Sequence, residues 1–378
     1  MENIFIYGMA ADGKWFTDRE EDRKRLSANF LYGVNTIIIS PRRYGKTSLV
    51  RNVAGSFHAP GIKIILCDIF SCKTQEDFYK VFAKSIIKQT ASKWEEWLEN
   101  TRRFLSALTP KISFGSDPAN DFSISFDLTD KQLLDEEILN LPLKIAKEKN
   151  LKIVVCIDEF QQISEFPDHI LFQKKLRSYW QLQANAVSYC LFGSKKHLMR
   201  DFFSKSSMPF YKFGDVLFLD KIASEHWIAY IRKRFNDTGK HIPEDMALKI
   251  CQTIDNHSSY VQQLAWLVWI RTEHTATWEN FNDACSDLLV QNSNLFSNYY
   301  DNLSALQIKF LKAIADGHTE NLNSAEILRN YEIPSSSNIT RIKKSLEQKE
   351  IIDINHKKVT FNDPAFLLWF KKLIHFAQ

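Results

Sequence analysis

The sequence predicts an α/β protein whose core is a parallel β-sheet, followed by a helical region and a small domain of helices and a hairpin. Two observations predict the sheet. Its apolar runs are continuous rather than alternating, which is typical of strands covered on both faces. Stretches with apolar residues three or four positions apart separate them, as crossover helices require. The runs occupy residues 35–40, 62–70, 151–160, 186–194 and 215–220.

The composition is that of an ordinary globular protein. The 378 residues suffice for two or three domains of roughly 100–200 residues each. The net charge of +4 comes from 49 basic and 45 acidic residues, a balance that excludes a protein that coats nucleic acid through charge alone. The sequence shows no signal peptide, no apolar run of spanning length and no C-x-x-C pair among its six cysteines. We therefore expect a reduced, cytoplasmic protein that does not act in a membrane.

Residues 111–126 depart from the alternation of apolar runs and helices. Two alternating runs flank a Gly-Ser-Asp-Pro-Ala-Asn-Asp turn, which predicts a β-hairpin inserted into the α/β region. The apolar stripe of this hairpin would either contact a partner or pack on the parent domain, and packing is the favoured interpretation. The stripe consists of Ile112, Phe114, Phe122, Ile124 and Phe126.

The strand pattern ends at Asp220, so the first domain is predicted over residues 1–220. Helical periodicity at residues 224–235, 243–254 and 258–271 predicts a helical lid domain over residues 221–295. Residues 296–378 contain three helical patterns and then two short alternating runs around Asn355-His356-Lys357, which is typical of a winged helix. The expected elements there are helices at 305–316, 324–330 and 337–349, a hairpin at 351–361 and a last helix at 364–376.

The most informative motif is Ser-Pro-Arg-Arg-Tyr-Gly-Lys-Thr-Ser at residues 40–48, between the first predicted strand and a helix. It approximates G-x-x-x-x-G-K-[ST], with Ser40 in place of the first glycine. Backbone N–H groups and the helix N-terminus would surround phosphates, Lys46 would neutralise their charge, and the Thr47 hydroxyl would bind Mg²⁺. A strand–turn–helix that contains Gly-Lys-Thr by chance is the alternative. The candidate nucleotide-binding residues are Pro41, Arg42, Arg43, Tyr44, Gly45, Lys46, Thr47 and Ser48.

Asp158 and Glu159 stand directly at the end of a buried strand. Because an unpaired buried charge is costly, these carboxylates have no use in packing. We interpret Asp158 as a Mg²⁺ ligand and Glu159 as the base that orients and deprotonates the attacking water. Both motifs in this order favour a nucleotide site over a chance match. Ser194 ends the next run, where it either hydrogen-bonds the γ-phosphate or the water, or forms an ordinary turn.

Phe16 and Arg19 precede the first predicted strand in the stretch Phe-Thr-Asp-Arg-Glu. They are candidates for a base or ribose pocket. The competing explanation is a helix cap made by Thr17 and Asp18.

Taken together, these motifs resemble those of the archaeal-type P-loop ATPases of the AAA+/STAND group. The resemblance covers nearly the whole chain and implies an ASCE-type P-loop NTPase fold with strand order 5-1-4-3-2, a helical lid and a C-terminal winged helix. It also implies that Ser194 occupies the sensor position and that Lys212 stands where the family usually has an arginine. Lysine keeps that charge but loses the bidentate fork. The matching stretches are FTDREEDRKRL, SPRRYGKTSL, VVCIDEFQQI, FGSKKHLM and PFYKFGDVLFLDKI.

We expect a Mg²⁺-dependent ATP-binding protein and slow ATPase that acts as a molecular switch, with Lys46, Glu159, Ser194 and Lys212 as catalytic residues and ATP or ADP and Mg²⁺ as cofactors. The alternatives are a DNA-binding ATPase that uses the winged helix and an interaction scaffold that nucleotide stabilises. The expected state is a monomer or a nucleotide-dependent oligomer.

The charges of the winged helix bear on its partner. Basic residues favour contact with the DNA backbone, but acidic residues lie among them, so contact with a protein or packing within the chain is favoured over duplex DNA. The basic residues are Arg341, Lys343, Lys344, Lys349, Lys357 and Lys358, and the acidic ones are Glu347, Glu350 and Asp353.

Overall fold

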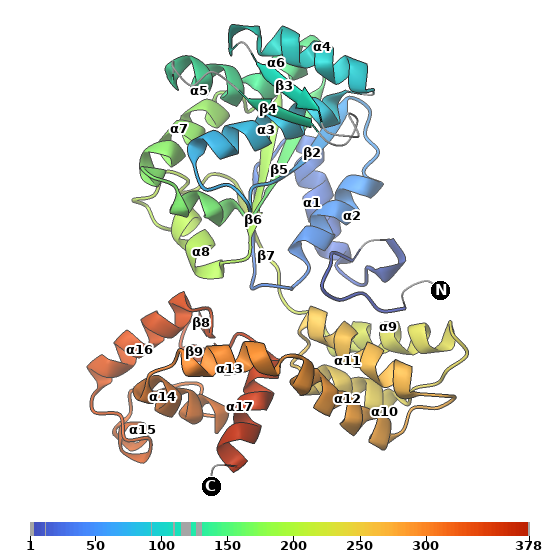
Figure 1. Cartoon of the computed structure of the whole chain (residues 1–378), viewed down its shortest axis with the longest axis vertical. Coiled ribbons are helices and arrows are strands. Elements are labelled where there is room, and N and C mark those ends of the chain that lie inside the picture. The colour runs from blue at the N-terminus through green and yellow to red at the C-terminus, as the bar shows by residue number, and fades with distance from the viewer. Residues whose placement is uncertain are drawn as a thin grey trace. The chain divides into compact units, whose positions relative to one another are not determined.

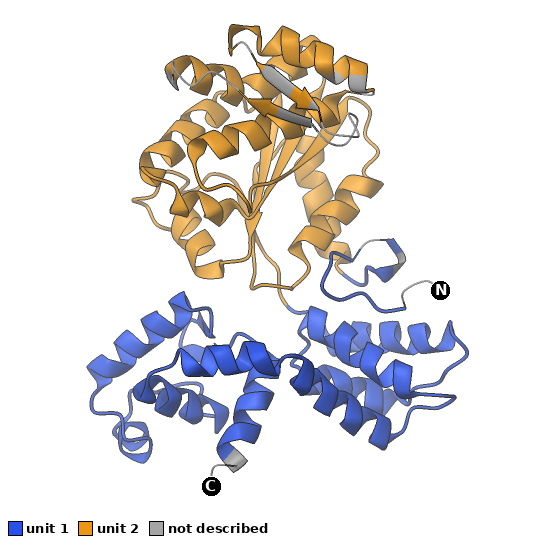
Figure 2. Ribbon diagram, viewed as in Figure 1, with its two compact units in different colours: residues 1–18, 221–378 blue, residues 19–220 orange. Residues whose placement is uncertain are grey.

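The computed structural model of the chain describes residues 4–11, 13–91, 93–108, 110–114, 122–125 and 131–376. Contacts divide the chain into two compact units, which we treat separately (Figure 2). One unit is Arg19–Asp220, and the other joins Met1–Asp18 to Lys221–Gln378.

A parallel sheet forms the centre of the Arg19–Asp220 unit (Figure 1). In the described residues its order is β2-β5-β6-β1-β7, which is the order 5-1-4-3-2 counted along the chain, as expected. All neighbouring pairs are parallel, and β1 lies between its partners with Ile37 opposite both Leu191 and Val216. The strands are β1 Thr36–Ile39, β2 Ile62–Asp68, β5 Lys152–Asp158, β6 Val187–Gly193 and β7 Asp215–Phe218.

Helices cover both faces of the sheet, with α1 and α2 on one face and α3, α7 and α8 on the other (Figure 1). Alternation along β1 explains this arrangement, because Ile37 and Ile39 join the apolar core with α3, α7 and α8 while Ile38 is buried on the opposite side. The predicted α/β core is confirmed. The helices are α1 Glu20–Tyr32, α2 Lys46–Ser56, α3 Gln75–Thr90, α4 Trp94–Phe104, α5 Lys131–Leu139, α6 Leu141–Glu148, α7 His169–Gln181 and α8 Lys196–Ser204, with 3₁₀ turns η2 Ser106–Leu108 and η3 Phe160–Glu165.

The inserted segment forms the predicted hairpin. Strands β3 Lys111–Phe114 and β4 Phe122–Ser125 pair antiparallel, with Ile112 opposite Ile124. Ile124 is buried in the core that α3 also lines, so this residue packs on the parent unit. The turn at 115–121 and Phe126 lie outside the described residues, as do the side chains of the other three members of the predicted stripe.

The second unit is helical except for one hairpin and one 3₁₀ turn, η1 Gly13–Trp15, within its described residues. The winged-helix pattern is found as predicted, with β8 and β9 antiparallel and joined by a tight turn at His356-Lys357. Two helices, α12 and α13, had no predicted counterpart, and α13 spans the residue at which the lid was expected to end. The elements are α9 Ser224–Asn236, α10 Glu244–Thr253, α11 Ser258–Arg271, α12 Trp278–Gln291, α13 Ser293–Asp301, α14 Ala305–Ala315, α15 Ala325–Asn330, α16 Ser336–Gln348, β8 Ile352–Asn355, β9 Lys358–Phe361 and α17 Pro364–Phe376.

The N-terminal residues pack on the helices of this second unit. Phe5 is 3% exposed, and its ring centroid lies 6.1 Å from those of Tyr230 and Phe235 on α9. The Ile6 N–H donates to Gln262 Oε1 at 2.9 Å. Burial of an aromatic ring therefore joins this segment to the lid helices, whereas the sequence pattern assigns residues 1–18 to the first domain. The division of 221–378 into a lid and a winged helix stays a prediction.

Across the described ranges, no helix combines the length and the apolar character that crossing a membrane requires.

Candidate active site

The loop at residues 40–45 connects β1 to α2 at the carboxyl edge of the sheet. Gly45 adopts a φ of 92° immediately before α2, a left-handed conformation that glycine adopts at little cost. A Cβ at this position would meet nothing within 4 Å, so the backbone angle and not crowding favours glycine. Because the first N–H groups of a helix lack partners within it, the start of α2 offers donors to an anion.

Lys46 is the first residue of α2, and its side chain points back into this loop, where it is only 6% exposed. Its ammonium donates to Pro41 O at 2.7 Å, to Ser40 O at 3.1 Å and to Ser40 Oγ at 3.2 Å. The three protons of a lysine ammonium are thus matched by three acceptors of the loop itself. A phosphate that enters the loop would take the place of these weaker, neutral acceptors.

Thr47 and Asp158 meet across two elements, because α2 begins beside the end of β5. The Thr47 hydroxyl donates to Asp158 Oδ2 at 2.7 Å, and the Glu159 N–H donates to Asp158 Oδ1 at 2.8 Å. Burial is the main cause that raises the pKa of Asp158 to about 6, with the charges of Glu159 and Asp68 adding to it and these two hydrogen bonds opposing it. The two predicted Mg²⁺ ligands therefore lie together.

Asp68 is a neighbouring carboxylate that is not among the site residues predicted from the sequence. It ends β2 in register with Asp158 and is exposed. Its Oδ1 accepts a hydrogen bond from the Phe70 N–H at 2.9 Å. The signal was available, because this aspartate ends an apolar run as Asp158 does.

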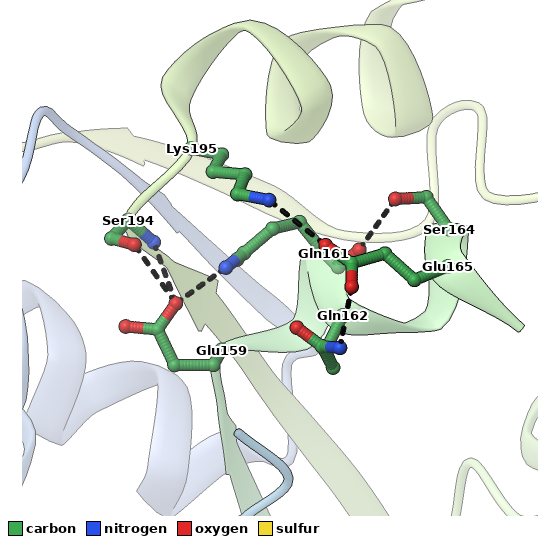
Figure 3. Close-up of polar contacts among 7 residues, drawn as sticks. All are labelled: Glu159, Gln161, Gln162, Ser164, Glu165, Ser194 and Lys195. Carbon is green, nitrogen blue, oxygen red and sulfur yellow. Dashed lines mark hydrogen bonds and ion pairs between the residues drawn. The ribbon is translucent and has the colours of Figure 1, made fainter. Parts of the chain in front are cut away.

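Glu159 is held at the end of β6 by two residues (Figure 3). Its Oε2 accepts hydrogen bonds from Ser194 Oγ at 2.9 Å, from Ser194 N at 3.4 Å and from Gln161 Nε2. Glu159 itself has a φ of 55°, so the chain turns sharply after Asp158 and the carboxylate returns to the sheet edge. The structure thus joins Glu159 to Ser194 and to Gln161, two contacts that the sequence analysis did not predict. The predicted bond of Ser194 to the γ-phosphate or the water stays a prediction.

An ion pair fixes the loop that follows β6. Lys195 Nζ lies 2.9 Å from Glu165 Oε1, and Gln162 Nε2 donates to Glu165 Oε2 at 3.0 Å (Figure 3). The hydrogen bond from Lys195 is the main cause that lowers the pKa of Glu165. The ion pair therefore joins the segment after Ser194 to the segment after Glu159, and Gln162 holds Glu165 in place within the latter.

Arg19 connects the start of α1 to the phosphate-loop motif. It is 7% exposed and donates from Nη2 to Tyr44 O at 3.1 Å and from Nη1 to Asp22 Oδ2 at 3.3 Å. The alternative of a helix cap made by Thr17 and Asp18 is wrong. Helix α1 begins at Glu20, so the N-cap position belongs to Arg19, whose side chain makes no capping bond. Phe16 belongs to the other compact unit, so a pocket formed by Phe16 and Arg19 stays a prediction.

The remaining predicted residues are less closely tied to this cluster. Arg42 and Arg43 are exposed on the loop, and Ser48 is buried in the first turn of α2. Lys212 is exposed with a φ of 52°, and its ammonium lies 5.4 Å from the ring centroid of Tyr211. Among the described residues its cation–π neighbour is the adjacent residue in the sequence. The role of Lys212 in place of the family's arginine therefore stays a prediction.

Comparison with known proteins supports the fold. A family model described as "Probable winged helix domain" matches residues 294–372. No curated protein matches the sequence. A Walker-type ATPase of Pyrococcus abyssi is similar in structure, with a TM-score of 0.68 and 16% identity over 98% of this chain and 100% of that chain. The chain has the fold of a Walker-type P-loop ATPase.

A second solved structure agrees with this assignment. The ORC2 protein of Aeropyrum pernix, in its ADPNP–ADP complexes, has a TM-score of 0.57 and 15% identity over 99% of this chain and 98% of that chain. At these identities the similarity extends to the fold and not to the activity. The expected P-loop fold with a C-terminal winged helix is thereby confirmed.

Proposed function

We propose that this protein binds ATP with Mg²⁺ at residues 40–48 and hydrolyses it slowly, as a nucleotide-dependent switch. The observation that carries the proposal is the hydrogen bond between Thr47 Oγ1 and Asp158 Oδ2, 2.7 Å long, beside the buried Lys46 ammonium. A hydroxyl and a carboxylate at one point provide oxygen ligands, which Mg²⁺ prefers. A cation and the N-terminus of a helix next to them suit a phosphate chain.

The residues present fit both cofactors. Thr47 and Asp158 would hold Mg²⁺, which when bound neutralises phosphate charge. Burial, followed by the neighbouring charges of Glu159 and Asp68, raises the pKa of Asp158 to about 6, and a bound cation beside this carboxylate would favour its charged form. The loop N–H groups and Lys46 would bind the phosphates. Glu159 would orient the attacking water and accept its proton, and Ser194 holds that carboxylate at the end of β6.

The switch role is supported by the way in which the two units are joined. The chain passes between them at Asp18–Arg19 and at Asp220–Lys221. Asp18 and Arg19 have φ values of 56° and 70°, a strained pair for residues other than glycine. Arg19 donates to Tyr44 O in the phosphate loop, and Asp18 Oδ1 lies 3.6 Å from His226 Nε2 on α9. Two consecutive residues therefore link the loop to the lid helices, so a change in the loop has a short route to the second unit.

ATP turnover by the purified full chain, with Mg²⁺ and with EDTA, tests the proposal. Lys46→Ala should abolish ATP binding in calorimetry, because the phosphate charge loses the buried cation of the loop. Arg51→Ala, which removes an exposed cation of α2 outside residues 40–48, is the matched control and should bind ATP nearly as well. Unchanged ATP affinity in Lys46→Ala, or no turnover by the parent protein, would overturn the assignment.

Binding of duplex DNA is a second candidate function, and the surface of α16 supports it. None of the exposed side chains of α16 is acidic, and the exposed tip of the hairpin is also free of acids. Such a surface suits contact with phosphates. The exposed residues are Ser336, Ser337, Thr340, Arg341, Lys344 and Gln348 on α16, and Asn355, His356, Lys357 and Lys358 at the hairpin.

The salt dependence of DNA affinity tests this second candidate. We expect Arg341→Ala and Lys344→Ala each to weaken binding and to reduce the steepness of the salt dependence, because each removes one phosphate contact. Lys349→Ala is the control, since its ammonium donates to Asn302 O at 2.6 Å and serves the fold. If the parent protein does not bind duplex DNA at low salt, this second candidate fails, and the alternative favoured by the sequence, contact with a protein or packing within the chain, is retained.

A further inference from the structure

We infer that Gln161 is a positioning residue for Glu159. Together with Ser194 it forms a clamp that donates hydrogen bonds to one carboxylate oxygen of Glu159 and leaves the other oxygen turned away from these two residues. This inference rests on the proposed ATP hydrolysis with Glu159 as the base. The relevant contacts all lie at the carboxyl edge of β5 and β6 and are drawn in Figure 3.

The two oxygens of Glu159 have unequal surroundings. Oε2 accepts from Gln161 Nε2, from Ser194 Oγ at 2.9 Å and from Ser194 N at 3.4 Å. Within the described residues no protein donor reaches Oε1, and Figure 3 shows it pointing away from both clamp residues. A carboxylate oxygen has about two acceptor sites, so Oε2 is saturated and Oε1 is the oxygen that can accept a proton from water.

Gln161 is itself fixed in one orientation. It is 3% exposed, and the Ser164 hydroxyl donates to its backbone carbonyl at 2.8 Å. Its Nε2 must face Glu159, because an exchange of the amide N and O atoms would place an oxygen against the carboxylate. Oε1 then lies buried without a hydrogen-bond donor among the described residues. A buried amide atom without a hydrogen bond costs free energy. Because the Gln161 amide stays buried despite this cost, the packing around it holds it in place.

Gly193 supplies the space that this amide needs. A Cβ at position 193 would lie 1.7 Å from Gln161 Oε1 and 2.9 Å from its Cδ. The φ of Gly193 is not positive, so its backbone angle does not require glycine. The neighbouring Gln161 side chain requires it, because a Cβ at this position would occupy the same space. Gly193 and Gln161 therefore act together: the missing side chain of Gly193 leaves the space in which the Gln161 amide lies and orients Glu159.

Two substitutions disturb this arrangement without touching Glu159. Gln161→Met keeps the volume of the buried side chain and removes its donor, while Gly193→Ala keeps the amide and displaces it. We expect each to lower kcat for ATP about 10- to 100-fold, as a misplaced base does, while KM for ATP stays within about twofold of the parent. The melting temperature should fall by several degrees, because a buried hydrogen bond or a tight contact is lost. Gln162→Met is the matched control, because Gln162 bonds Glu165 instead of Glu159, and it should turn over ATP at the parental rate.

A double-substitution cycle separates positioning from structure. In the Glu159→Gln background, where the base is already absent, Gln161→Met should have no further effect on single-turnover hydrolysis. Gln161→Met at the parental kcat, or a loss of ATP affinity equal to the loss of kcat, would overturn the inference. Failure of the proposed function itself reads differently: the parent protein would not hydrolyse ATP, or Glu159→Gln would hydrolyse it at the parental rate. If Gly193→Ala does not fold, the Gln161→Met results alone decide.

Discussion

Asp158→Asn should make the nucleotide-free protein more stable at pH 8 while it removes Mg²⁺-dependent ATP binding. Burial is the main cause that raises the pKa of this carboxyl from 3.8 to about 6. In the folded state the charged form is therefore disfavoured relative to the unfolded chain. Below about pH 3 the carboxyl is protonated in both states and costs nothing. As the pH rises through this interval the unfolded chain loses its proton first, so the free energy of unfolding falls, and above about pH 6 it becomes constant.

The size of this effect follows from the two pKa values. A difference of about 2 pKa units, at about 1.4 kcal/mol each, gives a cost of about 3 kcal/mol above pH 6. Asparagine carries no charge and can keep both contacts, because its amide oxygen accepts from the Glu159 N–H and its NH₂ group donates to the Thr47 hydroxyl. We therefore expect Asp158→Asn to raise the free energy of unfolding by up to about 3 kcal/mol at pH 8 and by only about 0.5 kcal/mol at pH 4.

Urea unfolding in EDTA at pH 4, 6 and 8 measures this difference. The matched control is Asp68→Asn, because Asp68 ends the adjacent strand but is exposed. Its effect should stay within about 0.5 kcal/mol at every pH, as for most surface substitutions. A gain for Asp158→Asn that is the same at pH 4 and pH 8, or a loss at pH 8, would refute the reasoning that burial of this charge destabilises the site.

Three further predictions concern hydrolysis and the link between the units. Glu159→Gln should bind ATP with near-normal affinity and hydrolyse it about 10²–10⁴-fold more slowly, and its trapped ATP state should differ from the ADP state in protease sensitivity over residues 221–295; a parental rate contradicts the base assignment, and an unchanged digestion pattern contradicts the switch. Lys212→Ala should reduce turnover more than ATP affinity if its ammonium meets charge that develops in the transition state; equal losses in both would make it a structural residue. Arg19→Ala should bind ATP but lose the ATP-dependent change in protease sensitivity, because its bond to Tyr44 O is removed; the same change with and without Arg19 would exclude this route.

Local patterns in the sequence were sufficient to predict the sheet and the motif that carries the candidate site. Strands buried on both faces carry nearly continuous apolar residues, so β5 and β6 could be recognised without knowledge of their neighbours. The Gly-Lys-Thr segment and the acid pair Asp158-Glu159 stand at strand ends, and the carboxyl ends of parallel strands meet at one edge. For the same reason the sequence predicted that Thr47 and Asp158 lie together. It did not predict the contact of Ser194 with Glu159, because it assigned the Ser194 hydroxyl to the γ-phosphate or the attacking water.

Only the tertiary structure decided which residues complete the site. Gln161 reads in the sequence as one polar residue among several after the acid pair, and its contact with Glu159 depends on the sharp turn at a positive φ and on the space left by Gly193. The place of Phe5 against α9 depends on burial against rings more than 200 residues away along the chain, and the neighbouring Ile6 N–H bonds Gln262 at a similar separation. Periodicity reports the environment of a residue's own element, whereas contacts between distant elements are fixed by packing and hydrogen bonding in three dimensions.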